Sequence, residues 1–266
     1  MKSEVKPFFI KVITPLHAGS GSDLGVVDMP IQRESHTSFP KIEASSLKGS
    51  IRSEFSSLSN IEDIFGSDNG EKAGQLGFSD AKILFFPVKS AKGVFAYITC
   101  PMVLKRLAED LKLGDTTNLE EIKIPTTIKD DECIVFENNV NSVNSHVILE
   151  EYSFKIQDNK LDDTYKIPEV DKSRLVIISD DNFIHFVKNS TEVITRIKIG
   201  KDGVVDKEAG ALFTEEYLPS ESVMYALALG EVSKLVNETP TIMQIGGNTT
   251  LGKGIVELSI GVQNGN

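Results

Sequence analysis

Apolar residues fall into short runs along the chain, separated by polar segments that contain glycine, a pattern typical of a domain with both helices and strands. Residues 6–15 are rich in β-branched and aromatic side chains and partly alternate with polar ones, which predicts a first strand. Residues 45–58 carry apolar side chains three or four positions apart, so they predict a helix with one apolar face. Two strands at 76–88 and 94–100 follow, and then an amphipathic helix at 101–113 with proline at its first position.

The second half of the chain predicts further strands beyond a polar region that is hard to assign, residues 114–172. Residues 193–199 alternate, with basic side chains on one side, and the Lys-Asp-Gly run at 201–203 is a good hairpin turn. We therefore expect a long hairpin over roughly residues 190–218. The other predicted elements are strands at 134–136, 147–156, 224–229, 241–245 and 255–260, a segment at 183–187 that can open a helix, and a short helix at 231–237.

The order of the predicted elements indicates an α+β fold. Strand, helix, strand, strand and helix, completed by the C-terminal strands, is compatible with a βαββαβ ferredoxin-like core, the topology of RNA-recognition domains. The length of 266 residues fits one large domain or a core with large insertions. The basic hairpin is plausible as a projecting thumb, although Arg and Lys also protect ordinary edge hairpins.

One polar segment, residues 17–52, lacks long apolar runs and concentrates glycines, a histidine and an aspartate. Its glycines at 19, 21 and 25 allow positive φ or a close approach to a ligand. It ends in Ser-Ser-Leu-Lys-Gly, which predicts a helix start with Ser45 or Ser46 as the N-cap. Free N–H groups at a helix start, with Lys48 beside them, favour bound phosphate. Most such loops and caps bind nothing, so only their combination supports a binding site.

A second glycine-rich segment, residues 242–256, lies near the C-terminus. Two apolar runs flank a loop that contains Gly246, Gly247, two further glycines and Lys253. Many segments of this kind are plain hairpins. This loop holds more glycine than a minimal turn needs, so we expect it to approach a backbone-like ligand closely.

The net charge of −11 argues against a general nucleic-acid binder, because neutralising phosphates needs Lys and Arg. Binding depends on the local field, however, and a basic strip can form while acidic residues lie elsewhere. Lys48 and Arg52 stand four positions apart and share one helix face, which is either a phosphate-facing edge or an ordinary solvated face. Lys41 and Lys253 would extend the strip.

Cysteine usage and hydropathy predict a cytoplasmic protein. The two cysteines, at 100 and 133, lie far apart and outside any CxxC pair, so neither a zinc site nor a disulfide scaffold is predicted. This suits a reducing compartment. The first residues lack the apolar core of a signal peptide, and no apolar run approaches the length of a membrane span, so no membrane partner is expected.

The chain contains no Walker-type loop, dinucleotide fingerprint, HExxH sequence or nucleophile elbow. The candidate acid–base groups are His17, Asp28 and the adjacent Glu215 and Glu216. Cleavage of RNA by its own 2′-hydroxyl needs positioning, a proton acceptor and charge stabilisation at the phosphate. Asp28, on a glycine-flanked loop, can act as the base or hold a divalent cation. The alternative is a turn residue before the Met-Pro pair, since Asp is common in turns.

Four segments of the chain resemble the backbone subunit of type III-B (Cmr) CRISPR effector complexes, which belongs to the RAMP superfamily. They are TPLHAGSGSDLGVVDMPIQRE, SSLKGSIRSEF, GALFTEEYLP and QIGGNTTLGKGIV, and they cover both ends of the chain and residues 209–219. The related type III-A backbone subunit shares the glycine loop and the SLKG helix, but PIQRE and LFTEEYLP fit type III-B better. The resemblance is least specific between about residues 105 and 171.

The resemblance implies a single RAMP domain over residues 1–266. It would have a ferredoxin-like palm, insertions at roughly 114–172 and a thumb hairpin at roughly 190–218 that intercalates between segments of the guide–target duplex. Copies of the protein would form a helical backbone along a CRISPR RNA, with complementary target RNA and other Cmr-complex subunits as partners. Target RNA would be cut at regular intervals.

The resemblance also implies roles for individual residues. Asp28 would be required for target-RNA cleavage, assisted by Mg²⁺ or Mn²⁺ that Asp28 would help to hold. His17 would position groups near the guide RNA, and Glu215 or Glu216 would lie near the cut site. Guide-RNA contacts are implied for Lys48, Arg52, Gly246, Gly247 and Lys253. Further candidates for RNA binding are Arg33, Lys41, Ser46 and Gly49.

Two other functions are compatible with the same residues. A non-catalytic scaffold would hold guide RNA with the same fold, and Asp28 would then be purely structural. A guide-processing endoribonuclease, as some RAMP relatives are, would use His17 as its general base. Metal-dependent cleavage that is lost in an Asp28 variant excludes the scaffold, and a His17-dependent cut of repeat RNA by the protein alone would support the processing enzyme.

Overall fold

The computed structural model describes residues 4–22, 25–56, 60–114, 128–158, 161, 170–200, 204, 212–232 and 241–260. Within these ranges the helices are α1 (Ala44–Glu54), α2 (Ile61–Phe65), α3 (Pro101–Leu111) and α4 (Asp180–Asn189), with 3₁₀ turns η1 (Lys172–Arg174) and η2 (Thr249–Leu251). The strands are β1 (Glu4–Val12), β2 (Lys41–Ile42), β3 (Leu76–Phe78), β4 (Ala81–Lys89), β5 (Phe95–Thr99), β6 (Glu132–Val135), β7 (Ser142–Val143), β8 (His146–Leu149), β9 (Tyr152–Ile156), β10 (Leu175–Ile177), β11 (Glu192–Ile197), β12 (Leu212–Tyr217), β13 (Val223–Gly230), β14 (Ile242–Gln244) and β15 (Ile255–Ile260).

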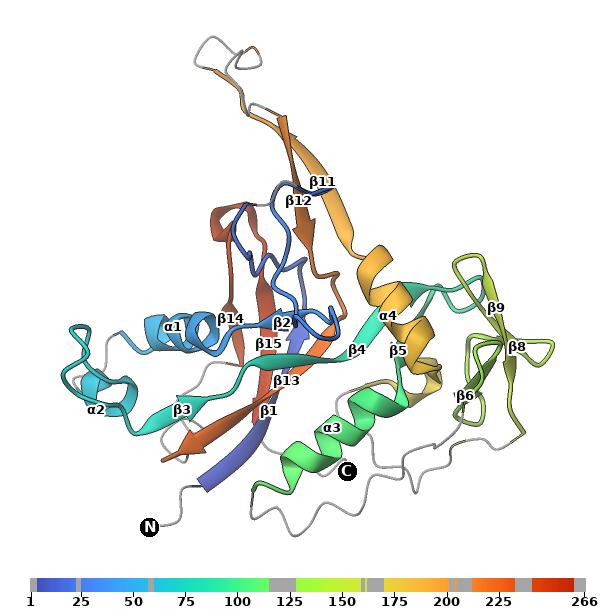
Figure 1. The fold of residues 1–266 in the computed structure, drawn as a ribbon, viewed down its shortest axis with the longest axis horizontal. Coiled ribbons are helices and arrows are strands. Elements are labelled where there is room, and N and C mark those ends of the chain that lie inside the picture. Colours follow the sequence, from blue (N-terminus) through green and yellow to red (C-terminus); the bar gives the residue numbers. More distant parts are fainter. Residues whose placement is uncertain are drawn as a thin grey trace.

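Among the described residues, 13 strands form one large mixed sheet (Figure 1). Its order is β14-β15-β1-β13-β4-β5-β10-β6-β9-β8-β7, with β2 paired to β4 and β3 paired to β13. Two pairs, β5 with β10 and β6 with β9, are parallel, and the remaining neighbours are antiparallel. The predicted α+β class is therefore confirmed.

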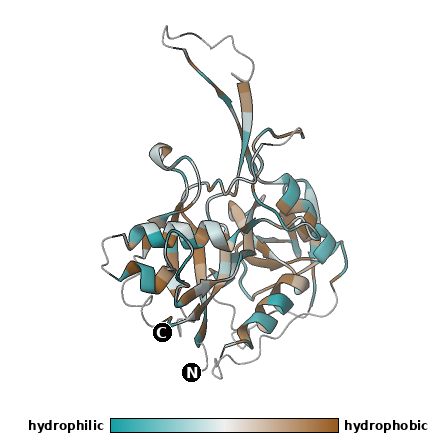
Figure 2. Ribbon diagram, turned by 60° about the vertical axis from the view of Figure 1, so that its left-hand side comes forward, coloured by the Kyte–Doolittle hydropathy of each residue, from teal (hydrophilic) through white to brown (hydrophobic). Residues whose placement is uncertain are grey.

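The core is built around β1, which lies between β13 and β15. Phe8, Phe9 and Ile10 are consecutive and each at most 1% exposed. Because successive strand residues point to opposite faces, their burial means that both faces of β1 are covered. Helix α1 adds Leu47 and Ile51 from its predicted apolar face to the same core. Figure 2 shows the same division, with apolar strands inside and hydrophilic residues on the outer faces of the helices.

Two elements of the first half differ from the prediction. Helix α1 begins at Ala44 and ends at Glu54, and position 58 of the predicted helix lies outside the described residues. The strand predicted at 76–88 is two strands, β3 and β4, because Ser79 interrupts it. The N–H of Leu227 donates to the Ser79 hydroxyl at 2.8 Å, so a side chain takes a bond that the backbone ladder would have made.

Residues 114–172 contain four strands, β6 to β9, in the part that the structure describes. The strand predicted at 147–156 is the hairpin of β8 and β9, which turns at Glu150 with φ of 49°. The segment predicted to open a helix lies in α4, whose N-cap Ser179 accepts a hydrogen bond from the N–H of Asn182. Most of the predicted helix at 231–237 lies outside the described residues.

Strands β11 and β12 form a separate antiparallel sheet, paired from Glu192 with Tyr217 to Ile197 with Leu212. Figure 1 shows these two strands extending away from the large sheet. Both strands fall within the hairpin predicted at 190–218, while its predicted turn at 201–203 lies outside the described residues. Within the described part of the chain, no helix is long and apolar enough to cross a membrane.

Candidate active site

Asp28 lies on an exposed loop and is held by one residue of β12, Thr214. Its carboxylate oxygen Oδ2 accepts hydrogen bonds from the backbone N–H of Thr214, at 2.7 Å, and from the Thr214 hydroxyl, at 2.8 Å. The N–H of Asp28 donates in turn to the same hydroxyl oxygen, at 3.0 Å. Among the described residues the second carboxylate oxygen, Oδ1, accepts no hydrogen bond. The carboxylate is therefore fixed through one oxygen, and the other is left for a ligand.

The two Thr214 donors also set the charge of Asp28. The backbone N–H first, and the hydroxyl second, stabilise the ionised carboxylate and hold the pKa of Asp28 below its ordinary value of 3.8. Asp28 is therefore a negatively charged hydrogen-bond acceptor at neutral pH and a weak proton acceptor.

Main-chain pairing fixes the Asp28 loop against β12. The N–H of Met29 donates to the carbonyl of Thr214, and the N–H of Glu216 donates to the carbonyl of Met29, both at 3.0 Å. These bonds determine where the loop lies, whereas the Thr214 side chain determines how the Asp28 carboxylate points.

The carboxylate of Glu216 anchors the continuation of the loop and is almost fully buried. Its Oε2 accepts a hydrogen bond from the N–H of Ile31 at 3.0 Å. Its Oε1 accepts from the guanidinium of Arg33 at 2.5 Å and from the hydroxyl of Thr191 at 2.7 Å. The same guanidinium also donates to two main-chain carbonyls. Glu216 and Arg33, predicted as catalytic and RNA-binding candidates, thus bind each other and join the loop to the chain ahead of β11.

Glu215 is buried on the opposite side of β12 and is also saturated. Its carboxylate pairs with the Nε of Arg196 at 2.9 Å and accepts hydrogen bonds from the Tyr217 hydroxyl at 2.7 Å and the Asn248 amide at 2.5 Å. Burial, together with the hydrogen bond to Glu215, raises the pKa of Tyr217 to about 12, so the phenol stays protonated. The geometry therefore suits a role for Glu215 in joining the hairpin to the C-terminal loop.

His17 connects both predicted glycine-rich segments. Its Nδ1 donates to the carbonyl of Glu216 at 2.7 Å, and its Nε2 lies 3.6 Å from the Glu215 carboxylate. Its own carbonyl accepts a hydrogen bond from the N–H of Gly247 at 2.9 Å. Gly246 has φ of 84°, and a Cβ there would overlap the His17 carbonyl oxygen, so this close approach needs glycine. The two segments therefore lie side by side, and the glycine pair of the C-terminal loop packs against the backbone of His17.

The predicted basic strip is only partly available. Lys41 pairs with Glu43 at 2.5 Å and with Asp80 at 3.3 Å, and Arg33 is bound to Glu216. Among the described residues, neither Lys48 nor Lys253 pairs with a carboxylate. The Nζ of Lys253 lies 4.9 Å from the centre of the Tyr217 ring. Of the predicted Lys and Arg contacts, these two lysines are therefore the better placed for phosphate.

The predicted N-cap of α1 is wrong. The N-cap is Glu43, and the carboxylate of Asp80 accepts the N–H of Ala44 at 2.9 Å, while Ser45 and Ser46 lie within the first turn. Acidic side chains thus occupy the start of the helix, which disfavours phosphate at its very end.

The remaining predicted contacts of α1 lie along the helix, away from the hairpin (Figure 1). Ser46 and Gly49 are exposed, and Arg52 pairs with the exposed Asp68 at 2.8 Å. An exposed ion pair of this kind is weak and exchanges easily for a phosphate.

The described residues around Asp28 do not by themselves form a complete set of metal ligands. Among the described residues, no group of three or more His, Cys, Asp or Glu side chains could hold a metal ion. Glu215 and Glu216 are the other acidic candidates that the sequence suggests. Their carboxylate oxygens already accept hydrogen bonds or ion pairs from Arg, Tyr, Asn, Thr and main-chain donors. In the part of the chain that the structure describes, Asp28 therefore offers one free carboxylate oxygen, where a divalent cation needs about six ligands.

Sequence reasoning missed Thr214, the residue that holds the Asp28 carboxylate by two hydrogen bonds. Thr214 lies inside the conspicuous FTEEYLP run, but its partner is 186 positions away in the chain. No local pattern connects the two positions. Asn248 was missed for the same reason, since its amide reaches Glu215 across 33 positions.

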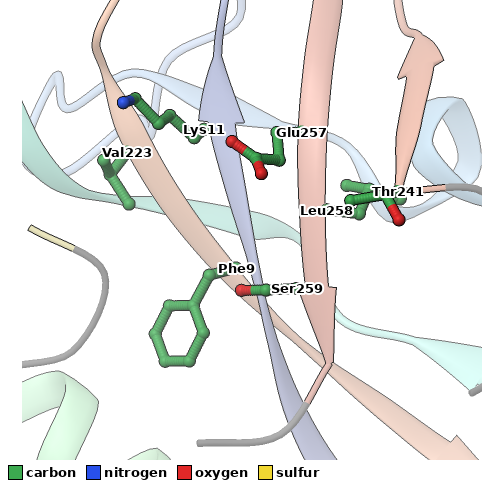
Figure 3. Close-up of a pocket in the computed structure, with 7 residues that line it drawn as sticks. All are labelled: Phe9, Lys11, Val223, Thr241, Glu257, Leu258 and Ser259. Carbon is green, nitrogen blue, oxygen red and sulfur yellow. The ribbon is translucent and has the colours of Figure 1, made fainter. Parts of the chain in front are cut away.

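A pocket on the large sheet is separate from this arrangement (Figure 3). It lies where β1, β13 and β15 run together, and Figure 3 shows Lys11 beside Glu257 and Phe9 beside Ser259. None of the predicted site residues lines it.

Comparisons with known proteins identify relatives that match almost the whole chain. The model of the RAMP superfamily matches residues 9–257. The Cmr endoribonuclease Cmr4 of a Pyrococcus furiosus CRISPR system is 41% identical over 280 residues, covering 93% of this chain and 92% of the relative. The crystal structure of oligomeric Cmr4 from Pyrococcus furiosus matches with a TM-score of 0.75 and 32% identity, over 97% of this chain and 98% of that one. A chain in the cryo-EM structure of the type III-B Cmr-beta bound to cognate target RNA matches with a TM-score of 0.78 and 26% identity, over 96% of each chain.

Proposed function

The chain belongs to the RAMP superfamily, and from this membership we propose that it is the target-cleaving backbone subunit of a type III-B CRISPR effector complex. The Pyrococcus furiosus relative is a Cmr endoribonuclease, and a similar structure is an oligomer of Cmr4. Another is a type III-B assembly on cognate target RNA. The partners of this chain are accordingly CRISPR RNA, complementary target RNA, further copies of the chain and the other Cmr subunits.

The fixed, exposed carboxylate of Asp28 carries the catalytic part of this proposal. In cleavage by the adjacent 2′-hydroxyl, a bond forms between O2′ and phosphorus and the bond from phosphorus to O5′ breaks. The 2′-hydroxyl proton is passed to solvent and the departing O5′ takes up a proton from solvent, so the products are a 2′,3′-cyclic phosphate and a 5′-hydroxyl. Because its pKa is low, Asp28 contributes mainly by accepting a hydrogen bond from the 2′-hydroxyl through Oδ1 and orienting O2′ for attack.

The hairpin of β11 and β12 is the proposed thumb, which would separate segments of the guide–target duplex. Val193, Ile197 and Leu212 lie on one face of this hairpin and are 50–64% exposed. Apolar side chains of this kind can wedge between base steps and unstack them. Thr214 lies on the same face, so the wedge and the Asp28 carboxylate are neighbours along β12. A nucleotide displaced by the wedge would therefore reach Asp28.

The guide-RNA contacts proposed from the resemblance fall into two groups. Lys48 and Lys253 supply charge, and Arg52 can exchange its exposed partner for phosphate. Gly246 and Gly247 supply a close main-chain approach beside His17. Arg33 and Lys41 act mainly within the protein, because their charges are already paired.

We also propose that residues 1–266 form a single RAMP domain in the cytoplasm, with a ferredoxin-like palm and the strands of 114–172 as an insertion. Dependence on Mg²⁺ or Mn²⁺ is proposed for the assembled complex. Since the described residues supply a single free carboxylate oxygen at Asp28, no catalytic step is assigned to the ion.

The complex reconstituted with a guide RNA and labelled complementary target tests the proposal. Wild type should yield a regular ladder of cuts, which is lost in Asp28→Asn while target binding is unchanged. Reactions in Mg²⁺, Mn²⁺ and EDTA test the metal requirement. A ladder that survives Asp28→Asn would leave this chain as a scaffold. A His17-dependent cut of repeat RNA would indicate guide processing, which the buried, engaged His17 ring disfavours.

A further inference from the structure

We infer that Thr214 is a positioning residue for target-RNA cleavage, because its hydroxyl determines which oxygen of the Asp28 carboxylate faces the RNA. The inference rests on the proposed function of Asp28 and deepens it. Thr214 itself touches no reacting atom. It acts only through the carboxylate that it holds.

The Thr214 hydroxyl is used in both directions. Its oxygen accepts the N–H of Asp28 at 3.0 Å, and its hydrogen is donated to Oδ2 of the same residue at 2.8 Å. This ring of bonds ties the Asp28 side chain to its own backbone through one atom of β12. Valine has the same shape as threonine but can neither accept nor donate here, whereas serine can do both.

Without the hydroxyl, the carboxylate would keep a single donor, the N–H of Thr214 at 2.7 Å. The terminal torsion of aspartate is broad, so one bond does not fix the plane of the carboxylate. Oδ1, which has no partner among the described residues, would then no longer face one direction. A misplacement of about 1 Å in a reacting arrangement reduces the rate by up to about 100-fold.

The loop itself does not depend on this hydroxyl. The N–H of Met29 still donates to the Thr214 carbonyl, and the N–H of Glu216 still donates to the Met29 carbonyl. These are main-chain bonds and persist in any side-chain variant that folds. Removing the hydroxyl should therefore change the orientation of Asp28 and leave the attachment of its loop intact.

Thr37 provides a matched control. Its hydroxyl donates to the carboxylate of Glu34 at 2.5 Å and accepts the N–H of Phe39 at 3.1 Å. Each of the two threonine hydroxyls thus donates to one carboxylate and accepts one backbone N–H. The carboxylate that Thr214 holds is the predicted catalytic one, whereas the carboxylate that Thr37 holds is paired with Arg106. Thr37→Val removes equivalent bonds elsewhere in the fold.

The experiment measures single-turnover cleavage of labelled target by the reconstituted complex, together with target affinity and the thermal midpoint. We expect Thr214→Val and Thr214→Ala to lower the cleavage rate constant about 10- to 100-fold with unchanged target affinity, the range for a lost hydrogen bond to a charged group. Thr214→Ser should stay within about threefold of wild type, because it retains both bonds. Thr37→Val should cleave at the wild-type rate.

A wild-type rate in Thr214→Val, or an equal defect in Thr214→Ser, would overturn the inference. So would a defect confined to target affinity. Asp28→Asn separates the inference from the function beneath it. If Asp28→Asn cleaves normally, the catalytic assignment of Asp28 fails. If Asp28→Asn is inactive while the valine and alanine variants cleave normally, only the role of Thr214 fails.

Discussion

Replacing Glu216 by glutamine tests whether its buried carboxylate anchors the Asp28 loop. The carboxylate accepts from Ile31 through Oε2 and from Arg33 and Thr191 through Oε1. An amide of the same shape has one oxygen and one NH₂ group. If the oxygen keeps Arg33 and Thr191, the NH₂ group faces the N–H of Ile31, and two buried donors oppose each other. If it keeps Ile31, the NH₂ group faces the guanidinium.

The cost follows from the better of these two orientations. One buried donor left without an acceptor costs about 1–3 kcal/mol, and Arg33, which is 21% exposed, loses its charged partner. We expect Glu216→Gln to lower the free energy of unfolding by about 2–4 kcal/mol. In a chain of this size, about 2–4 °C of thermal midpoint corresponds to each kcal/mol, so the midpoint should fall by about 4–16 °C.

Urea unfolding followed by circular dichroism measures this change, with an unchanged m-value as evidence that the unfolded surface is the same. Glu109→Gln is the matched control, since its i,i+4 pair with Lys105 is exposed and should be worth less than about 0.5 kcal/mol. A loss of unfolding free energy below about 0.5 kcal/mol for Glu216→Gln would show that its carboxylate does not anchor the loop. In a double-mutant cycle, the stability losses of Glu216→Gln and Arg33→Met should not add, because both variants remove the same interaction.

Two further predictions follow from close contacts and from charge. Gly246→Ala should destabilise the protein by at least about 2 kcal/mol in thermal melts and weaken guide-RNA binding, because φ is 84° and the added Cβ meets the carbonyl of His17. Gly49→Ala, with open space around it, should be neutral or stabilising in the same melts. Burial alone would raise the pKa of Glu34, but hydrogen bonds from Arg106 and Thr37 lower it below its ordinary value of 4.5. The stability that the Glu34 carboxylate contributes is therefore present above pH 4.5 and lost as the pH falls through the lowered pKa. The unfolding free energies of wild type and Glu34→Gln should converge in acid, and a constant difference down to pH 2 would contradict this prediction.

Local patterns were sufficient for the parts of the fold that depend on neighbours in sequence. The alternation of residues 193–199 predicted the hairpin. The density of glycine singled out the two segments that meet at His17. Helix α3 begins at Pro101, as its sequence predicts. Each of these features depends on side-chain period or backbone freedom, which a single sequence displays.

The parts that could not be predicted depend on long-range partners. Asp80 caps α1 from 36 positions away, so the local Ser-Ser signal named the wrong N-cap. Glu215 and Glu216 looked like free acid–base groups because charged side chains are usually exposed. They are buried only because Arg196 and Arg33 are brought to them by the fold. Periodicity contains no information about such pairings.

The alternation of β12 explains how these pairings serve the site. Thr214 and Glu216 stand two positions apart and therefore share a face, and both bind the loop that carries Asp28. Glu215 and Tyr217 share the opposite face, where both bind Asn248 of the C-terminal glycine segment. Four consecutive residues thus connect the hairpin to the proposed cleavage loop on one side and to the proposed guide-binding loop on the other. We therefore expect RNA that binds the proposed thumb to shift both loops together with β12, and the position of the Asp28 carboxylate to depend on how the duplex engages the hairpin.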